Sequence, residues 1–331
     1  MPESVLVTGG AGYVGSHTCK ALSRAGFLPV TYDNLSTGHR PAVRWGPLEE
    51  GDILDAERLA EVFARHQPTA VFHFAASIRV AESVADPQAY YDNNVLGTLR
   101  LLEQCRDAGV RDFIFSSTAA VYGEPRQLPI SEAHPLRPVN PYGSSKLLAE
   151  RLLLDFGQSC GLRSCALRYF NAAGADPGGE LGAEHRPLSH LVPILLEVAS
   201  GLRDDFEVFG EDYSTEDGSC VRDYVHVSDL AEGHLGALKY LRGGGASGAW
   251  NLGTGRGWSV RQMLQAARLV TGAGITAQSS GRRPGDPPAS VADPSAATRQ
   301  LDWSPRFTDP EVMIRHHWDW MNSEVRRSWL D

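Results

Sequence analysis

The chain has 331 residues, enough for one large domain and a smaller one, and its 42% hydrophobic and 21% charged content is typical of a globular protein. Basic residues number 31 and acidic residues 40, so the formal charge is −9; there is no long basic run, which argues against nucleic acid as the main partner. No apolar run reaches membrane-spanning length, the first residues lead into a strand, and the five cysteines have no C-x-x-C spacing. We therefore expect free thiols and a cytoplasmic protein without membrane association. The 11 histidines form no H-E-x-x-H pattern, so no metal site is expected.

The first predicted strand, Val5–Thr8, leads into a glycine-rich turn, Gly9–Gly15, and a predicted helix over Ser16–Ala25. The turn, GGAGYVG, fits both G-x-G-x-x-G and G-x-x-G-x-x-G. Glycines at this spacing permit a tight turn and close approach of the backbone to a pyrophosphate at a helix N-terminus. The pattern predicts a dinucleotide site.

A second predicted strand, Leu28–Tyr32, ends at Asp33, about 20 residues beyond the glycines. An acidic side chain at this position is suited to binding the hydroxyls of the adenine ribose. Its charge would repel a 2′-phosphate, so the sequence favours NAD over NADP.

Strands and helices continue to alternate along the chain. The predicted elements are a strand over Ala70–Phe74, a helix over Asn93–Ala108, a strand over Phe113–Phe115, a helix over Ser145–Phe156 and a strand over Cys165–Tyr169. This alternation predicts an α/β protein with a doubly wound parallel sheet of the Rossmann type. Polar residues at the strand ends, including Thr118 and Asn171, fall where such sheets bind ligands.

Tyr142 and Lys146 are four residues apart in a segment predicted to be helical, so the phenol and the ammonium lie on one face. A free tyrosine has a pKa of about 10, and a neighbouring cation favours the phenolate that could take a proton from an alcohol. Together with the predicted dinucleotide site, which would bind a hydride acceptor, Tyr142 and Lys146 predict an acid–base centre.

Ten motifs occur in order: TGGAGYVGSH, YDN, GDI, HFAA, YYDNN, FSSTAAVYG, PYGSSK, LRYFN, VRDYVHV and NLGTG. By these motifs the chain resembles the extended short-chain dehydrogenases/reductases, and within them the UDP-glucose 4-epimerases, over a span that begins at Val5 and ends near Trp320. The resemblance implies an isomerase in which NAD takes a hydride from C4 of a UDP-hexose and returns it to the opposite face. It implies that Tyr142 is the base, that Lys146 lowers its pKa and holds the nicotinamide ribose, and that the Thr118 hydroxyl binds the reacting oxygen.

The same resemblance assigns the remaining ligand contacts. The cofactor set is Gly9, Gly12, Tyr13, Val14, Gly15, Asp33, Asn34, Asp52, Ile53, Phe74, Ala75, Ala76, Asn93, Tyr142, Lys146 and Phe170. The substrate set is Thr118, Asn171, His190, Leu191, Phe209, Arg222, Arg283, Asp286 and Ser290. Of these, Arg222 and Arg283 are expected to clamp the diphosphate, a role suited to the planar fork of a guanidinium.

Three positions depart from the pattern of some family members. Ile78 replaces a lysine near the cofactor phosphates, and His190 replaces an asparagine. Ser290 replaces a bulky tyrosine that walls the sugar pocket beside C2. Because small residues there accompany acceptance of an N-acetyl group, we hypothesise that UDP-N-acetylhexosamines are also substrates.

Other functions remain open at this stage. A 4,6-dehydratase needs an Asp-Glu pair after the Ser/Thr position, and Ala119-Ala120 cannot transfer protons, so dehydration is disfavoured. Epimerases of UDP-pentoses (UDP-arabinose/UDP-xylose) or of UDP-glucuronate share every motif quoted. A non-catalytic NAD-binding regulator would have no need of Thr118, Tyr142 and Lys146 together.

We expect residues 1–175 to form the NAD-binding domain, rejoined by 221–240, and the remainder of 176–331 to form the UDP-sugar domain. By analogy with the superfamily, we expect a homodimer formed by the helices over Asn93–Ala108 and Ser145–Phe156.

Overall fold

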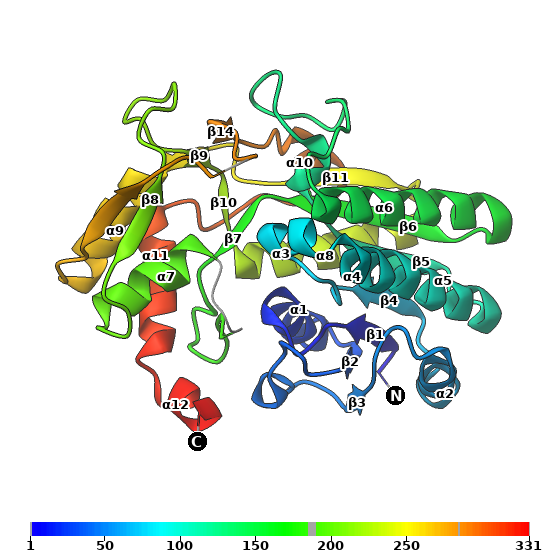
Figure 1. Ribbon diagram of the computed structural model, residues 1–331. Helices are drawn as coiled ribbons and strands as arrows, with labels where there is room; N and C mark the ends of the chain where they lie inside the picture. The colour runs from blue at the N-terminus through cyan, green and yellow to red at the C-terminus, as the bar shows by residue number, and fades with distance from the viewer. Residues whose placement is uncertain (1, 185–189, 284, 331) are drawn as a thin grey trace.

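The structure, a computed structural model, describes residues 2–184, 190–283 and 285–330. Among these residues, seven parallel strands form one sheet in the order β11-β6-β5-β4-β1-β2-β3 (Figure 1). The strands are β1 (Ser4–Thr8), β2 (Leu28–Asp33), β3 (Leu48–Glu50), β4 (Ala70–His73), β5 (Asp112–Thr118), β6 (Arg163–Tyr169) and β11 (Gly248–Leu252). The order reverses direction beside β1, as in a doubly wound Rossmann sheet, and the predicted fold class is confirmed.

Helices cover both faces of the sheet because its strands are apolar on both sides. In β1, Val5 and Val7 belong to one core cluster and Leu6 to another, as the two-residue period of a strand requires. The helices packed on the first face are α1 (Tyr13–Arg24) and α8 (Val227–Arg242), and those on the second are α2 (Ala56–His66), α5 (Gly97–Ala108) and α6 (Pro141–Cys160).

The later part of the chain forms a smaller α/β region with its own core around Leu195, Met263 and Trp320 (left in Figure 1). Its paired strands are β7 (Asn171–Ala173) with β10 (Tyr224–His226), β8 (Phe206–Phe209) with β13 (Ala277–Ser280), and β9 (Val221–Arg222) with β12 (Trp258–Ser259) and β14 (Ala289–Ser290). Its helices are α7 (Leu191–Ala199), α9 (Val260–Thr271), α11 (Pro310–Met321) and α12 (Glu324–Leu330). Shorter elements are η1 (Arg40–Ala42), α3 (Val80–Ala85), α4 (Pro87–Tyr91), η2 (Asp92–Leu96), η3 (Ala119–Tyr122) and α10 (Ser295–Gln300). Within the described ranges, no helix is long and apolar enough to span a membrane.

The chain returns to the large sheet after residue 221. Helix α8 packs on α1, and β11 then pairs with β6 from Gly248↔Cys165 to Leu252↔Tyr169. This edge strand lies outside both stretches that the sequence assigned to the NAD-binding domain, and the proposed domain bounds stay a prediction.

Several element boundaries differ from the sequence-based expectation in ways that matter for the site. The helix predicted over Asn93–Ala108 begins as a π-helical segment, η2, before α5. Helix α6 begins at Pro141 instead of Ser145, with Asn140 as its N-cap, so Tyr142 lies in its first turn. Strand β5 extends to Thr118, which is therefore the last residue of the strand.

Candidate active site

The glycine-rich turn between β1 and α1 is closely packed against its neighbours. Gly9 has a φ of +70°, and its N–H donates to the Tyr32 carbonyl at 2.8 Å. A Cβ on Gly9 would lie 2.6 Å from the Ala75 nitrogen, and one on Gly15 would lie 2.2 Å from the Gly9 oxygen, so larger residues do not fit. A cradle without Cβ atoms at a helix N-terminus exposes backbone N–H groups to a phosphate. The turn therefore fits the pyrophosphate of a dinucleotide.

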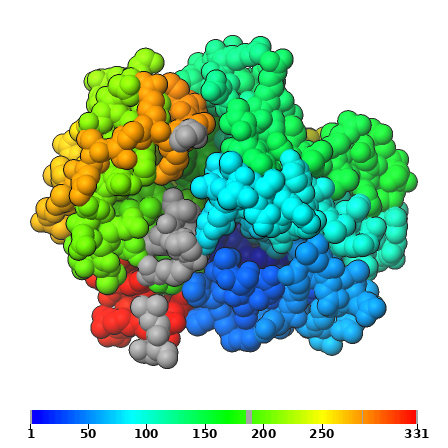
Figure 2. Space-filling model, in the orientation of Figure 1, coloured from blue at the N-terminus to red at the C-terminus, as the bar shows by residue number. Residues whose placement is uncertain are grey.

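Asp33 ends β2 beside this turn. Its carboxylate accepts hydrogen bonds from the Ala11 N–H at 3.0 Å and the Leu35 N–H at 2.9 Å. Burial raises the pKa of Asp33, and the two N–H groups oppose this rise. A hollow opens at this edge of the sheet, between the cyan segment that contains α3 and the blue segment that follows β2, with the dark-blue N-terminal segment at its base (Figure 2).

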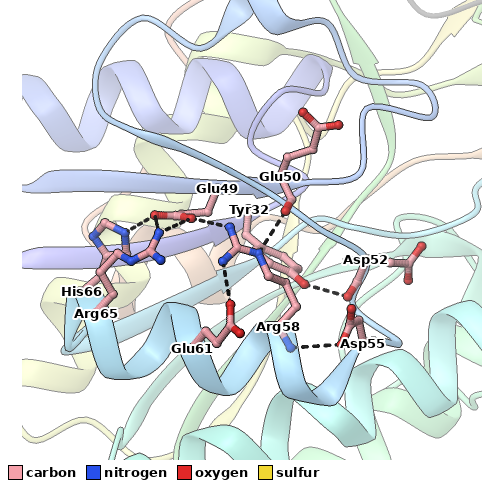
Figure 3. A network of polar contacts seen from close by, with 9 residues as sticks. All are labelled: Tyr32, Glu49, Glu50, Asp52, Asp55, Arg58, Glu61, Arg65 and His66. Carbon is pink, nitrogen blue, oxygen red and sulfur yellow. Dashed lines mark hydrogen bonds and ion pairs between the residues drawn. The ribbon is translucent and has the colours of Figure 1, made fainter.

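The segment after β3 lies at the same edge (Figure 3). The Asn34 amide donates to the Asp52 carboxylate at 2.8 Å, and the Tyr32 hydroxyl donates to the Asp52 carbonyl at 2.7 Å. Ile53 is 4% exposed, and a Cβ on Gly97 would lie 2.5 Å from its Cδ1. The side chain of Ile53 thus belongs to the core, and only its backbone is available to a ligand.

The segment Phe74–Ala76 follows β4, and the residue after it, Ser77, is bound by a side chain of η2. Asn94 is 2% exposed; its side chain accepts from the Ser77 N–H at 2.8 Å and donates to the Ser77 carbonyl at 2.9 Å and to Ser145 Oγ at 3.0 Å. The predicted cofactor residue Asn93 donates to Asn94 Oδ1 at 2.9 Å. Asn94 was not predicted, because two adjacent asparagines give no sequence signal for which one faces inward.

Two predicted aromatic contacts have their rings packed against protein. The Phe74 ring centroid lies 4.7 Å from that of His234 in α8. Phe170 packs on the small cluster of Val121, Tyr122 and Ile130. Both residues follow the carboxyl ends of sheet strands, so their backbones lie at the binding edge even though the rings serve the core.

The hydroxyls of Thr118 and Tyr142 meet at the carboxyl end of β5. Asn140 caps α6 by accepting from the Gly143 N–H at 2.9 Å. A Cβ on Gly143 would lie 2.6 Å from the Ala120 oxygen, so α6 begins in direct contact with the turn after Thr118. The Thr118 hydroxyl acts on the Tyr142 phenol by hydrogen bonding in the direction that lowers the pKa of the phenol.

Lys146 lies one helical turn after Tyr142 and is 2% exposed, with Nζ 4.4 Å from the centroid of the Phe115 ring. Burial lowers the pKa of Lys146 to about 7, and the Glu150 carboxylate opposes this shift. Burial also raises the pKa of Tyr142 and outweighs the bond to Thr118. The expectation that Lys146 lowers the pKa of Tyr142 stays a prediction.

A buried ion pair, which the sequence analysis missed, joins the helix of Tyr142 and Lys146 to the sheet. Arg168 of β6 donates to both carboxylate oxygens of Glu150 in α6, at 3.0 and 2.6 Å, and to the Tyr122 hydroxyl at 3.1 Å. Ser117, the neighbour of Thr118, donates to the same carboxylate at 2.5 Å. This cluster fixes the position of α6 relative to the end of β5.

Arg222, Asp286 and Ser290 are brought together in the smaller region. Ser290 pairs with Arg222 in the β14–β9 register. The Arg222 guanidinium donates to the Pro287 carbonyl at 2.9 Å and lies 3.4 Å from the Asp286 carboxylate. The fourth predicted residue of this group, Arg283, stacks at 4.3 Å on the ring of Phe209 at the end of β8.

Two of these residues, Arg283 and Asp286, border a cavity of about 700 Å³. Its lining includes Arg283, Asp286 and Tyr213, and the segment 124–128 closes its other side. The cavity places both cationic and aromatic groups around a space large enough for part of a nucleotide.

Asn171, His190 and Leu191 lie on elements that face the glycine-rich turn. Asn171 begins β7, and His190 is the N-cap of α7, whose first residue is Leu191. The His190 ring centroid is 6.4 Å from that of Tyr13, so a predicted substrate residue approaches a predicted cofactor residue. The Tyr13 hydroxyl also donates to the Gly174 carbonyl after β7.

Asp223, within the VRDYVHV motif, was given no role from the sequence. It is fully buried and accepts from Thr254 N–H at 2.8 Å, Gly255 N–H at 3.0 Å and Ala292 N–H at 3.2 Å. Neighbouring residues of the motif thus differ in function: Arg222 is directed toward Asp286, and Asp223 binds two segments of backbone, at 254–255 and at 292.

The chain belongs to the NAD dependent epimerase/dehydratase family, which its residues 5–253 match. A UDP-glucose 4-epimerase of Rhizobium leguminosarum bv. trifolii is 51% identical over 96% of this chain and 97% of its own length. The crystal structure of UDP-glucose 4-epimerase from Brucella ovis in complex with NAD is 51% identical with a TM-score of 0.93, covering 96% of this chain and 97% of that one. The Bifidobacterium longum UDP-glucose 4-epimerase in complex with NAD+ and UDP is 37% identical with a TM-score of 0.92, covering 97% and 98%. The resemblance inferred from the ten motifs is confirmed.

Proposed function

We propose that the protein uses NAD to interconvert UDP-glucose and UDP-galactose by transient oxidation at C4. The observation that carries this proposal is the meeting of Thr118, Tyr142 and Lys146 at the end of β5, at the same edge of the sheet as the glycine cradle and Asp33. Relatives named UDP-glucose 4-epimerase at 51% and 47% identity over 96% of the chain support it.

Bound NAD would supply the acceptor for the C4 hydride and the source of its return. Tyr142 would take the proton from O4 as the alcohol becomes a ketone, and the Thr118 hydroxyl would hold the same oxygen. An anionic phenolate would favour the protonated form of Lys146, whose pKa in the polypeptide alone is about 7. Arg222 and Arg283 would bind the diphosphate. The remaining residues of the cofactor and substrate sets are proposed as the contacts around these groups.

The direct test is turnover of UDP-galactose by purified protein, followed as formation of UDP-glucose with and without added NAD. Tyr142→Phe removes the proton acceptor but keeps the ring, and we expect a loss of about 10²- to 10⁴-fold. Tyr240→Phe is the matched control, because the Tyr240 ring packs on Trp250 in the core of the sheet face. Near-normal turnover by Tyr142→Phe, or none by the wild type with NAD present, would contradict the proposal.

We infer from Ser290 that UDP-N-acetylhexosamines are also accepted. The small Ser290 side chain is partly buried in β14 opposite Arg222, so a larger residue would occupy space beside the predicted diphosphate clamp. The Ser290→Tyr variant should lose activity on UDP-N-acetylglucosamine and keep it on UDP-glucose. Wild type that ignores the N-acetylated sugar, or a variant that still converts it, would refute this inference.

We further propose a homodimer formed through η2, α5 and α6. Leu96, Leu148 and Leu154 on these helices are 38%, 46% and 46% exposed, which supports burial of this face against a second copy. Light scattering should give twice the mass of one chain, and Leu148→Glu should lower the measured mass.

We also propose that the protein works in a reducing compartment such as the cytoplasm, which its five free cysteines, four of them buried, support.

A further inference from the structure

The family resemblance places Asp52 and Ile53 near the adenine of the cofactor, and the backbone that leads into them is anchored by side chains that lie behind it. We propose, on the basis of the proposed NAD-binding function, that Arg58 and Tyr32 are positioning residues for the adenine half of the cofactor. They hold the backbone of Glu50–Asp52 in a single conformation before the cofactor binds.

Arg58, in the first turns of α2, reaches the strand β3 through two of its nitrogens, and its third nitrogen binds Glu61 within α2 (Figure 3). Its Nε donates to the Glu50 carbonyl at 3.1 Å, and its other two nitrogens bind Glu49 at 2.5 Å and Glu61 at 3.1 Å. The bond to the carbonyl is the important one, because Glu50 directly precedes the Gly51–Asp52 segment. Arg58 thus links helix α2 to the backbone after β3, at the edge of the sheet where the cofactor is proposed to bind.

Glu49 provides the fixed point that keeps Arg58 in this orientation. Its side chain is 8% exposed and also binds Arg65 at 2.9 Å and His66 at 2.6 Å. Although burial acts to raise the pKa of Glu49, the hydrogen bonds from His66, Arg65 and Arg58 bring it to about 2. The carboxylate therefore stays charged at neutral pH. Arg65, 58% exposed, binds Glu49 but makes no recorded bond to the backbone that follows β3.

Tyr32 holds the other end of the same short segment. Its hydroxyl donates to the Asp52 carbonyl at 2.7 Å, and burial raises its pKa, so it remains a donor. A Cβ on Gly51 would lie 2.5 Å from the Tyr32 hydroxyl oxygen, and the Gly51 N–H donates to the Asp33 carbonyl at 3.1 Å. The carbonyls on both sides of Gly51 are thus fixed by side chains, and its N–H by β2.

A segment fixed in this way loses little conformational freedom when a ligand binds, and preorganisation of this kind increases affinity. The Asp52 carboxylate, which also accepts from Asn34 at 2.8 Å and from the Leu54 N–H at 2.9 Å, then meets the ligand in a set orientation. Loss of Arg58 or Tyr32 should weaken NAD binding without touching the UDP half of the site.

The test compares Arg58→Gln with Arg65→Gln in the full chain freed of bound nucleotide. Both variants remove one cation from Glu49, but only Arg58 also holds the Glu50 carbonyl. We expect the NAD dissociation constant to rise about fivefold or more in Arg58→Gln, as for one net hydrogen bond, and to change less than about twofold in Arg65→Gln. Tyr32→Phe should raise it by about threefold or more, and the dissociation constant of UDP should stay within about twofold in every variant.

Equal NAD affinities for Arg58→Gln and Arg65→Gln, or parallel losses of NAD and UDP affinity, would overturn the positioning role. If Arg58→Gln fails to fold, Tyr32→Phe and Arg58→Lys, which keeps a cation for Glu49 but has no Nε–H donor, decide the question in the same assay. A wild-type chain that binds UDP but no NAD would instead refute the proposed function, a result distinct from any difference among the variants.

Discussion

Replacing Arg168 with methionine tests whether the buried ion pair beneath the catalytic helix stabilises the fold. The substitution removes two hydrogen bonds to Glu150 and one to Tyr122. Glu150 is 7% exposed, and its carboxylate then keeps the hydrogen bond from the Ser117 hydroxyl but has lost its cation. Removing one partner of a buried pair costs about 3–5 kcal/mol, a large share of the 5–15 kcal/mol by which proteins are usually stable.

Urea unfolding of the ligand-free protein measures this loss. The double variant Arg168→Met/Glu150→Leu removes the stranded charge, so it should recover about 2 kcal/mol or more relative to Arg168→Met. Arg40→Met is the control, because Arg40 and its partner Glu50 are 64% and 58% exposed and such a pair is worth about 0–1 kcal/mol. An Arg168→Met variant within about 1 kcal/mol of wild type, or a double variant with additive losses, would refute the reasoning.

Three further predictions concern charge. Asp33→Asn should raise the NAD dissociation constant about tenfold, measured by titration, because an amide is a weaker acceptor for ribose hydroxyls; unchanged affinity would contradict the assignment. Burial lowers the pKa of Lys146 from 10.5 to about 7. The buried ammonium therefore destabilises the folded state by its full amount below pH 7, and this destabilisation disappears as the pH rises toward 10.5. Lys146→Met should therefore unfold at higher urea than wild type at pH 7, lose this advantage by pH 10, and lose turnover. Burial also lowers the pKa of His17 and of His317 from 6.5 to about 4. Because the unfolded chain binds these protons more readily, the folded protein should lose stability as the pH falls from 6.5 toward 4. The urea midpoint of His17→Gln should fall less steeply over this range than that of the wild type.

The features that sequence predicts well are those set by local spacing. The glycine turn and Asp33 belong to one strand–helix–strand unit, and Tyr142 and Lys146 are one helical turn apart, so each can be placed without knowing the rest of the fold. The start of α6 was placed four residues late, because its cap and first turn, Asn140 to Gly143, contain residues that are poor helix formers away from a terminus.

The residues that support the site could not be found in this way. Arg168 meets Glu150, and Asn94 meets Ser145, only because the fold brings distant segments together and buries them. The direction of the Tyr142 pKa shift was also beyond sequence, since it depends on how deeply the phenol is buried. Polar residues of this kind look like surface residues until their partners are known.

The central claim is that the chain oxidises and reduces the same carbon, C4, with Tyr142 handling only the oxygen-bound proton. UDP-galactose carrying deuterium at C4 tests this most directly, with the product examined by NMR after conversion in ordinary water. The account predicts UDP-glucose that retains deuterium at C4, because the hydride does not exchange with solvent. UDP-glucose with hydrogen in its place would contradict it.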